Sequence, residues 1–266
     1  MGQKPGLTGF GLKVIALVLM TADHVGQFFS FAGAPLWLRW IGRLSAPLFF
    51  FLLAEGFVHT RNRKGYLGRM YLCSLGMNLL NGLVNRLFSR PDGFLVDNNI
   101  FATLFLTLLL LCLGSWTRAA VEKRRFERLF GPAGVFFLFF LAPFLFERLP
   151  EEWVALRQGL AWLFPNPLLT EGSPTFLLLG IWMACMREYR AAFCAGYLLI
   201  SLSFLADGYD PFTVGYQWMM AFALPLLLCY NGKRGRGGKL LFYGYYPLHI
   251  TLLFLSSCLL YPLLCG

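Results

Sequence analysis

Charged residues are scarce in this sequence. They make up 14% of its 266 residues, whereas hydrophobic residues make up 58%. An ordinary soluble domain contains about a quarter charged residues, so that class is excluded. The seven cysteines form no CxxC pair and no spacing with histidine that is typical of a zinc site. We therefore interpret them as small buried hydrophobic residues and expect neither a disulfide framework nor a bound metal.

Other features that the sequence lacks exclude further classes of protein. The first apolar run lacks a small-residue cleavage site and is followed at once by a second run, so we expect it to be retained as the first helix. No internal repeat is visible, which argues against the paired halves of many transporters. No Walker pattern is present, so nucleotide hydrolysis is not indicated. Because no linker is visible either, we expect a single integral membrane domain over residues 1–266.

Long apolar runs fill most of the chain. A helix that spans a bilayer needs about 20 mostly apolar residues. The runs therefore predict an all-α polytopic membrane protein with about nine transmembrane helices. The predicted spans are 8–31, 40–60, 66–88, 98–116, 129–147, 172–187, 191–206, 212–230 and 240–262. Residues 150–171 are interrupted by prolines and contain only a short apolar run, so we expect an external or re-entrant segment there; if it crossed twice, the count would be about eleven.

Basic and acidic loops alternate along the chain. The loops after the second, fourth, sixth and eighth predicted spans are basic, and those after the third, fifth and seventh carry acids. Since basic loops stay in the cytoplasm, this alternation predicts a cytoplasmic N terminus and an external C terminus. The same rule accounts for the net charge of +10. We therefore expect the lipid bilayer, and not nucleic acid, as the partner of this chain.

An acid and an imidazole stand side by side in the first predicted span, at Asp23 and His24. Ionisable groups are costly at that depth and typically mark a functional site. Adjacent helical side chains diverge by about 100°, so Asp23 cannot orient His24 directly. Arg43 enters the membrane at a comparable depth and can pair with Asp23. His24 would then act as a general base or as an acyl-carrying nucleophile; the alternative is a structural ion pair beside a hydrogen-bonded histidine.

A second histidine lies early in the last predicted span. His249 follows Pro247, which frees backbone groups, and Tyr245 lies four residues before it. Together with Tyr246, these tyrosines alone would be typical of an interfacial aromatic belt. A histidine at that depth indicates a function, so we predict that His249 and Tyr246 support the site.

Polar residues in other predicted spans have structural or functional interpretations. Capping explains Asn98 at the start of the fourth span, whereas Asn99 and Thr103 could face an acceptor. Glu55 and His59 are spaced to pair on one helix face near the cytoplasm, and Glu55 could instead line the entry of a cavity.

The loop from Asn231 to Lys239 is rich in glycine and in positive charge. Positive-inside charge alone would explain it. Glycine also lets an anion approach the backbone, so the loop could bind a phosphate-bearing donor. The residues that we predict to bind this donor are Lys233, Arg234, Arg236 and Lys239.

Several blocks of this sequence resemble the TraX family, in the same order and over nearly the whole chain. The blocks are Lys13–His24, Gly42–Phe49, Asn99–Leu104, Ala223–Leu226 with Tyr230–Gly235, and Phe242–His249. The namesake of that family acetylates the N terminus of pilin, and the family is similar to membrane acyltransferases that take acetyl-CoA from the cytosol and use a buried histidine. The resemblance implies that His24 is catalytic, with Asp23 and Arg43 in support.

Taken together, these features favour an acyltransferase in the bacterial cytoplasmic membrane. It would move an acyl group, expected to be acetyl, from cytosolic acetyl-CoA to an amine or hydroxyl acceptor such as a peptide N terminus, a glycan or a small molecule. One alternative is a transporter in which Asp23, His24 and His249 relay protons. Another is a non-catalytic subunit of a secretion complex. The sequence does not indicate an oligomeric state.

Overall fold

The computed structural model describes residues 6–172 and 174–265, with side chains except at 239–241. Within that part of the chain, all regular elements are helical, apart from one isolated bridge between Leu7 and Tyr230. The α-helices are α1 (Gly9–Phe28), α2 (Trp37–Gly42), α3 (Ser45–His59), α4 (Arg63–Leu87), α5 (Ile100–Glu122), α6 (Phe130–Phe136), α7 (Ala142–Phe146), α8 (Val154–Leu163), α9 (Thr175–Met186), α10 (Arg190–Leu202), α11 (Leu224–Leu228) and α12 (Lys239–Cys265). Short 3-10 helices cover Ser30–Ala32, Phe126–Leu129, Glu151–Trp153, Ser203–Asp207 and Tyr216–Ala223, and a π-helical turn covers Phe137–Leu141.

Six helical segments among the described residues are long and apolar enough to cross a membrane. They are Gly9–Phe28, Trp37–His59, Ile100–Glu122, Phe126–Phe146, Arg190–Asp207 and Phe242–Cys265. A bilayer core about 30 Å thick requires helices of this length. The predicted all-α, multi-pass membrane architecture is therefore confirmed.

The other three predicted spans are helical but do not meet the same requirement. The segments Thr175–Met186 and Tyr216–Leu228 are apolar but shorter than 18 residues. Helix α4 is 25 residues long, but the polar side chains of Asn78, Asn81 and Asn85 lower its hydropathy. The count of nine spans and the orientation of the termini stay predictions. In the predicted external or re-entrant segment, α8 has ten residues and is about 15 Å long.

The chain folds into two compact units, each built from separate stretches of sequence. Within the described residues, the first unit comprises 6–55, 80–96 and 182–265, and the second comprises 56–79 and 97–181. The first unit contains both buried histidines, whereas the second contains α5, α6, α7 and α8. The predicted single domain over 1–266 stays a prediction.

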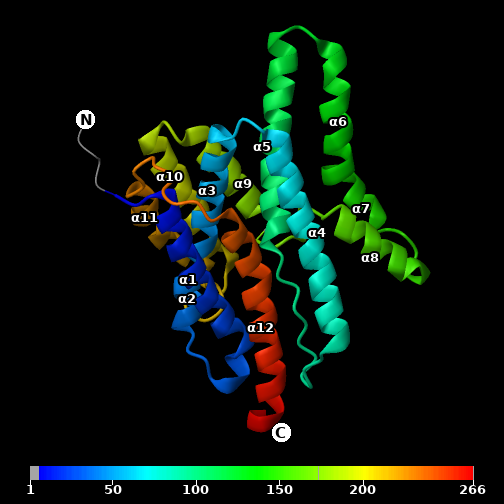
Figure 1. The fold of residues 1–266 in the computed structure, drawn as a ribbon, viewed down its shortest axis with the longest axis vertical. Coiled ribbons are helices and arrows are strands. Elements are labelled where there is room, and N and C mark those ends of the chain that lie inside the picture. The colour runs from blue at the N-terminus through cyan, green and yellow to red at the C-terminus, as the bar shows by residue number, and fades with distance from the viewer. Residues whose placement is uncertain (1–5, 173, 266) are drawn as a thin grey trace. The chain divides into compact units, whose positions relative to one another are not determined.

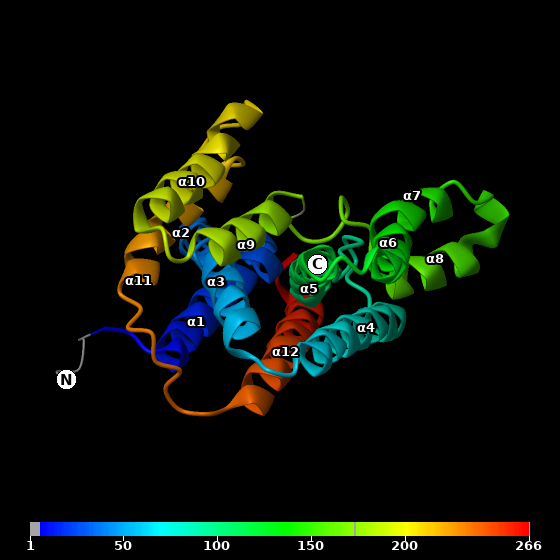
Figure 2. The same ribbon diagram turned by 90° about the horizontal axis from the view of Figure 1, so that it is seen from above.

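Helix α1 lies at the centre of the first unit, with α2 and α12 packed against it (Figures 1 and 2). Two glycines permit the close approach of α1 and α2. A Cβ atom on Gly42 would collide with the side chain of Asp23, and one on Gly26 would lie 3.0 Å from Cδ of Arg39. Small residues at this crossing therefore bring polar side chains of α1 and α2 into direct contact.

The beginning of α1 is bound by the basic loop that precedes α12. The amides of Gly9 and Phe10 donate to the carbonyls of Lys233 and Arg234, at 2.8 and 2.9 Å. The first amides of a helix lack partners within the helix, and here the loop supplies them. Gly235 adopts a φ of +74°, and a Cβ there would lie 3.0 Å from Cβ of Phe10. Glycine at this position thus permits both the turn and the close approach.

The far end of α1 is bound by a buried arginine. Nη1 of Arg90 donates to the carbonyl of Phe28 at 2.9 Å, and Nε donates to Oδ1 of Asp92 at 3.0 Å. Its guanidinium lies 4.4–5.3 Å from the centres of three aromatic rings, those of Phe31, Phe94 and Tyr261. The hydrogen bond from Arg90 lowers the pKa of Asp92 below its ordinary value. Because Tyr261 belongs to α12, Arg90 connects the ends of α1 and α12.

Candidate functional site

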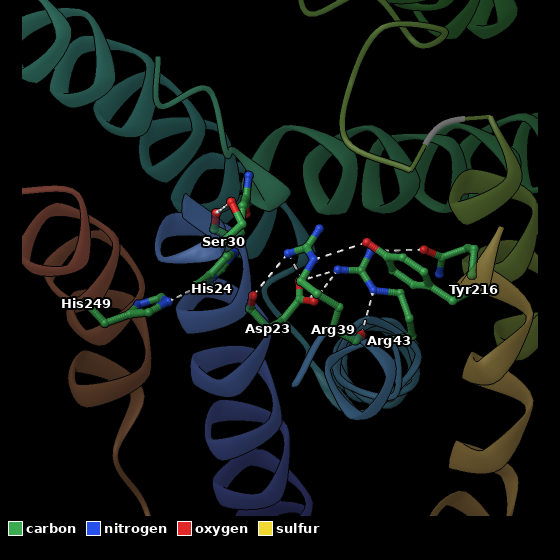
Figure 3. Close-up of polar contacts among 9 residues, drawn as sticks. Asp23, His24, Ser30, Arg39, Arg43, Tyr216 and His249 are labelled. Atoms are coloured by element: carbon green, nitrogen blue, oxygen red, sulfur yellow. Dashed lines mark hydrogen bonds and ion pairs between the residues drawn. The ribbon is translucent and has the colours of Figure 1, made fainter. Parts of the chain in front are cut away.

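Asp23 faces α2, where two arginines bind its carboxylate (Figure 3). Nη2 of Arg43 contacts both carboxylate oxygens. Nη1 of Arg39 lies 3.2 Å from Oδ1 and also donates to the backbone carbonyl of Asp23 at 3.0 Å. The predicted ion pair between Asp23 and Arg43 is therefore present, and Arg39 is a second partner that the sequence analysis missed.

Side chains from the 3-10 helix Tyr216–Ala223 hold the two arginines in place. Nε of Arg39 donates to the hydroxyl of Tyr216 at 3.2 Å, and Nη1 of Arg43 donates to Oε1 of Gln217 at 3.1 Å. The guanidinium of Arg43 also lies 5.6 Å from the centre of the Tyr216 ring. The arrangement brings α1, the segment 37–43 and the 3-10 helix Tyr216–Ala223 together around one carboxylate.

His24 points away from Asp23, towards α12 (Figure 3). Its Nδ1 lies 2.8 Å from Nε2 of His249, and both residues are buried. Neighbouring positions on a helix diverge by about 100°, which explains why Asp23 and His24 contact different helices. The structure thus brings together the two histidines that the sequence analysis selected, which lie 225 residues apart.

The hydrogen bonds of the histidines define which nitrogens carry protons. Nδ1 of His249 lies 2.8 Å from the carbonyl oxygen of Tyr245, which can only accept, so Nδ1 carries a proton. A neutral His249 then has a bare Nε2, which must accept the proton of Nδ1 of His24. In the neutral pair, Nε2 of His24 keeps its lone pair. Among the described residues, none forms a hydrogen bond to that nitrogen.

Aromatic rings surround the histidine pair. The ring of Tyr245 stacks on His249 with centres 5.0 Å apart, and its hydroxyl lies 2.8 Å from Oγ1 of Thr21. The ring of Tyr246 lies 5.6 Å from that of His249 and 6.3 Å from that of His24. Tyr246 therefore contacts both histidines, which is the position that its predicted supporting role requires.

The basic loop places its side chains on the surface. Lys233, Arg234 and Arg236 are exposed, while the carbonyls of the first two bind the start of α1. The loop therefore belongs to the same unit as His24 and presents its cations at the opposite end of α1 from Phe28. The side chain of Lys239 lies outside the part of the chain that the structure describes.

Asn99 has a structural role, which corrects the expectation for the start of α5. The predicted cap was Asn98, but α5 begins one residue later, and Oδ1 of Asn99 accepts from the amide of Ala102 at 3.3 Å. Its Nδ2 donates to the carbonyl of Ser74 and to Oδ1 of Asn78, at 3.0 and 2.7 Å. All these partners belong to the second unit, so they give no support to a role for Asn99 beside His24.

Glu55 also has a partner that the sequence analysis did not name. Its Oε1 lies 3.2 Å from Nε of Arg187, which follows α9. This ion pair between two distant segments of the first unit was not visible from the spacing of Glu55 and His59.

Arg39, Tyr216 and Gln217 are the members of the site that the sequence analysis missed. Arg39 lies four residues before Arg43 and so shares its helix face, a signal that could have identified it. Tyr216 and Gln217 carry no comparable signal, because only tertiary packing brings them to α2.

No group of three His, Cys, Asp or Glu side chains in the described residues could hold a metal ion. The two histidines alone provide fewer protein ligands than the three of a typical catalytic zinc site. The site thus consists of two parts. Nε2 of His24, which has no hydrogen-bond partner among the described residues, lies on one side of α1, and the cluster of Arg39 and Arg43 around Asp23 lies on the other.

A protein-family model matches a stretch of the chain that includes every residue of the candidate site. The family model of the TraX protein matches residues 9–257. The chain belongs to the TraX family. It is also 30% identical to the probable fimbrial assembly protein FimC, serogroup H1, of Dichelobacter nodosus, over 95% of this chain and 97% of that protein. No solved structure matches this TraX chain.

Proposed function

We propose that this TraX family member is a membrane-embedded acyltransferase in which His24 performs the proton or acyl transfer. The observation that carries the proposal is the buried 2.8 Å contact between Nδ1 of His24 and Nε2 of His249, which in the neutral pair leaves a lone pair on Nε2 of His24. A base oriented by a third group is the typical arrangement for activating a nucleophile.

Two routes use the same nitrogen. In direct transfer, Nε2 of His24 takes a proton from the acceptor amine or hydroxyl, which attacks the thioester carbon; the C–S bond breaks, and the proton passes to the departing thiolate. In the two-step route, Nε2 attacks the thioester carbon itself, the C–S bond breaks and the thiolate leaves. The acceptor then attacks the acyl carbon, the C–N bond to the histidine breaks, and the acceptor's proton passes through the freed Nε2 to the thiolate. In both routes, His249 stabilises the positive charge that develops on His24.

The donor would enter from the basic loop. Lys233, Arg234 and Arg236 present exposed cations that suit the phosphates of acetyl-CoA. Their loop is bound to Gly9, and His24 lies fifteen residues further along α1, or about 22 Å along the helix axis. The extended pantetheine arm of coenzyme A has a comparable length, so one donor molecule could contact both places.

The acceptor would come from the other side of the membrane. We place the protein in the bacterial cytoplasmic membrane, with its N terminus in the cytoplasm and its C terminus outside, as the alternation of loop charges predicts. The D. nodosus relative is named a probable fimbrial assembly protein. That name supports an acceptor among the components of a surface fibre, such as a peptide N terminus.

A proton relay through the histidines is a second candidate, because the hydrogen bond between His24 and His249 could also pass protons. A non-catalytic role in fibre assembly is equally compatible with the name of the relative. Both alternatives predict no turnover of acetyl-CoA, and the relay predicts ion flux in proteoliposomes that is lost in His24→Ala.

The test compares coenzyme A release by the purified protein with that of two histidine variants. With acetyl-CoA in lipid nanodiscs and water as the surrogate acceptor, the wild type should release coenzyme A and acetate. His24→Gln should slow this release at least about 100-fold, as for the loss of a general base. His59→Gln is the matched control and should stay within about twofold, because His59 lies at the end of α3 and outside the site. Equal rates for the wild type and His24→Gln would contradict the proposal.

A further inference from the structure

The cluster around Asp23 carries more positive charge than its carboxylate neutralises. Arg39 and Arg43 both contact Asp23, and the described residues provide no other acid that contacts either guanidinium. One positive charge therefore remains in a partly buried site. An uncompensated charge at such a place is costly, so it favours the binding of an anion.

Two hydrogen-bond donors in this cluster are open. Nη2 of Arg39 has no hydrogen-bond partner among the described residues, because its contacts with Asp23 use Nη1 and its contact with Tyr216 uses Nε. The hydroxyl of Tyr216 accepts the proton of that Nε, so its own proton is available to a further acceptor. Since Nε and the hydroxyl lie 3.2 Å apart, both open donors belong to one small area.

The rest of the cluster keeps these donors in place. Arg43 is fully engaged with Asp23, with Gln217 and, at 3.3 Å, with the carbonyl of Arg39. The side chains of Arg39 and Arg43 are 17% and 19% exposed, so a ligand can reach them. A fork of arginine donors beside a hydroxyl suits the oxygens of a carboxylate or a phosphate.

We propose that Arg39 and Tyr216 form a subsite for a carboxylate or phosphate group on the acyl acceptor. The inference rests on the proposed function for the identity of the molecule, but not for the binding of the anion. The donor has its own cations at the start of α1, whereas Asp23 lies fourteen residues beyond Gly9, close to the end of α1 that is expected to face outwards. The acceptor would thus bind through its anionic group on the Asp23 side of α1 and present its nucleophile to His24.

The test measures anion binding without acetyl-CoA. The protein is purified in dodecyl maltoside, which carries no anionic group, and its unfolding temperature is followed against inorganic phosphate or acetate. The Lys233→Gln, Arg234→Gln, Arg236→Gln variant serves as the background, because it removes the cations of the donor loop. In this background, phosphate and acetate should each cause a saturable rise in Tm.

Substitutions in the subsite should weaken that binding selectively. Adding Arg39→Gln should raise the apparent Kd for phosphate at least about tenfold, as for the loss of a charge-assisted hydrogen bond. Tyr216→Phe keeps the ring against Arg43 and both arginines, so it tests the hydroxyl in a protein that stays folded even if Arg39→Gln does not. It should raise the Kd about fivefold.

Three results would overturn the subsite. The first is the absence of any saturable rise in the loop variant, and the second is a rise that neither Arg39→Gln nor Tyr216→Phe reduces. The third is stabilisation by the anionic lipid phosphatidylglycerol alone, which would assign the cluster to lipid headgroups. If anion binding depends on Arg39 while the wild type releases no coenzyme A, the proposed acyltransferase function is wrong, but the proposed anion subsite still holds.

Discussion

At the scale of single residues, Asp23 and His24 have different partners although they are adjacent in the sequence. Asp23 binds Arg39 and Arg43 of the segment 37–43, and His24 binds His249 of α12. The direction of each side chain follows from helix geometry, because consecutive residues diverge by about 100°. One residue therefore organises a positive cluster, and its neighbour keeps a free nitrogen.

The proton positions on the histidines can be measured directly. In protein labelled with ¹⁵N at histidine, we expect neutral His24 to carry its proton on Nδ1 and not on Nε2. The chain has only three histidines, so the signals can be assigned by substitution. His249→Ala should remove this preference, because the acceptor of the Nδ1 proton is lost. His59→Gln should leave it unchanged, and a His24 protonated on Nε2 in the wild type would refute the arrangement.

The charge of Asp23 is expected to stabilise the fold. Asp23→Asn leaves two guanidiniums facing a neutral amide, which should lower the free energy of unfolding by about 2–3 kcal/mol, less than for a fully buried pair because these side chains are partly exposed. Unfolding in mixed micelles measures the loss. Glu122→Gln breaks the exposed pair with Arg118 and should have no measurable effect. If Asp23→Asn were as stable as the wild type, the ion pairs of Asp23 would not stabilise the fold.

At the scale of elements, the packing of α1 against α2 depends on glycine. A Cβ atom on Gly42 would occupy the space of Asp23, whereas a Cβ atom on Gly114 of α5 would have no atom within 4 Å apart from the adjacent residues and the backbone of its own helix. We therefore expect Gly42→Ala to lower the free energy of unfolding by about 1–3 kcal/mol, as for overpacking. Gly114→Ala should be neutral or stabilising by up to about 1 kcal/mol, because alanine favours helix.

The same unfolding assay compares the two glycine variants. If Gly42→Ala is as stable as Gly114→Ala, then α1 and α2 do not approach as closely as the structure has them. Loss of coenzyme A release in a stable Gly42→Ala protein would instead show that a small displacement of Asp23 disturbs the site without unfolding it.

In helix α12, the local sequence predicted the polar residues of the site but not their contacts with other helices. His249 after Pro247 predicted a functional region, whereas the tyrosines alone would have indicated an aromatic belt. The region contains both the carbonyl that binds Nδ1 of His249 and the ring of Tyr246. The spacing of four residues between Tyr245 and His249 was visible in the sequence. Their partner on α1 was not, because nothing in one chain sequence specifies a contact across 225 positions.

At the scale of the whole molecule, the pattern of apolar runs predicted the class, and tertiary contacts determined the site. Hydropathy identified the six long helices, because each must satisfy its own backbone inside lipid. It could not separate a spanning helix from the twelve-residue α9, since both are apolar. Arg39 was missed because it precedes the run that predicted the second span, and Tyr216 and Gln217 were missed because they reach the site only through folding.

The orientation of the chain can be tested with two epitope tags. A tag inserted after Gly208 should be accessible to antibody in intact spheroplasts, and a tag after Gly237 only after permeabilisation, because the loop charges predict that these sites lie on opposite sides of the membrane. A Cβ atom at either glycine would have no atom beyond the adjacent residues within 4 Å, so both loops are open enough for the insertions to be tolerated. The reverse pattern would place the basic loop outside and remove it from any cytosolic donor.

The most direct test of acyl transfer at His24 is a structure with a ketone analogue of acetyl-CoA, in which a methylene group separates the sulfur from the carbonyl carbon and prevents cleavage. We expect the phosphates to contact Lys233, Arg234 or Arg236, and the carbonyl carbon of the analogue to lie about 3–3.5 Å from Nε2 of His24, as in a reactive complex. An analogue that binds with its acyl end away from His24, or that does not bind at saturating concentration, would contradict it.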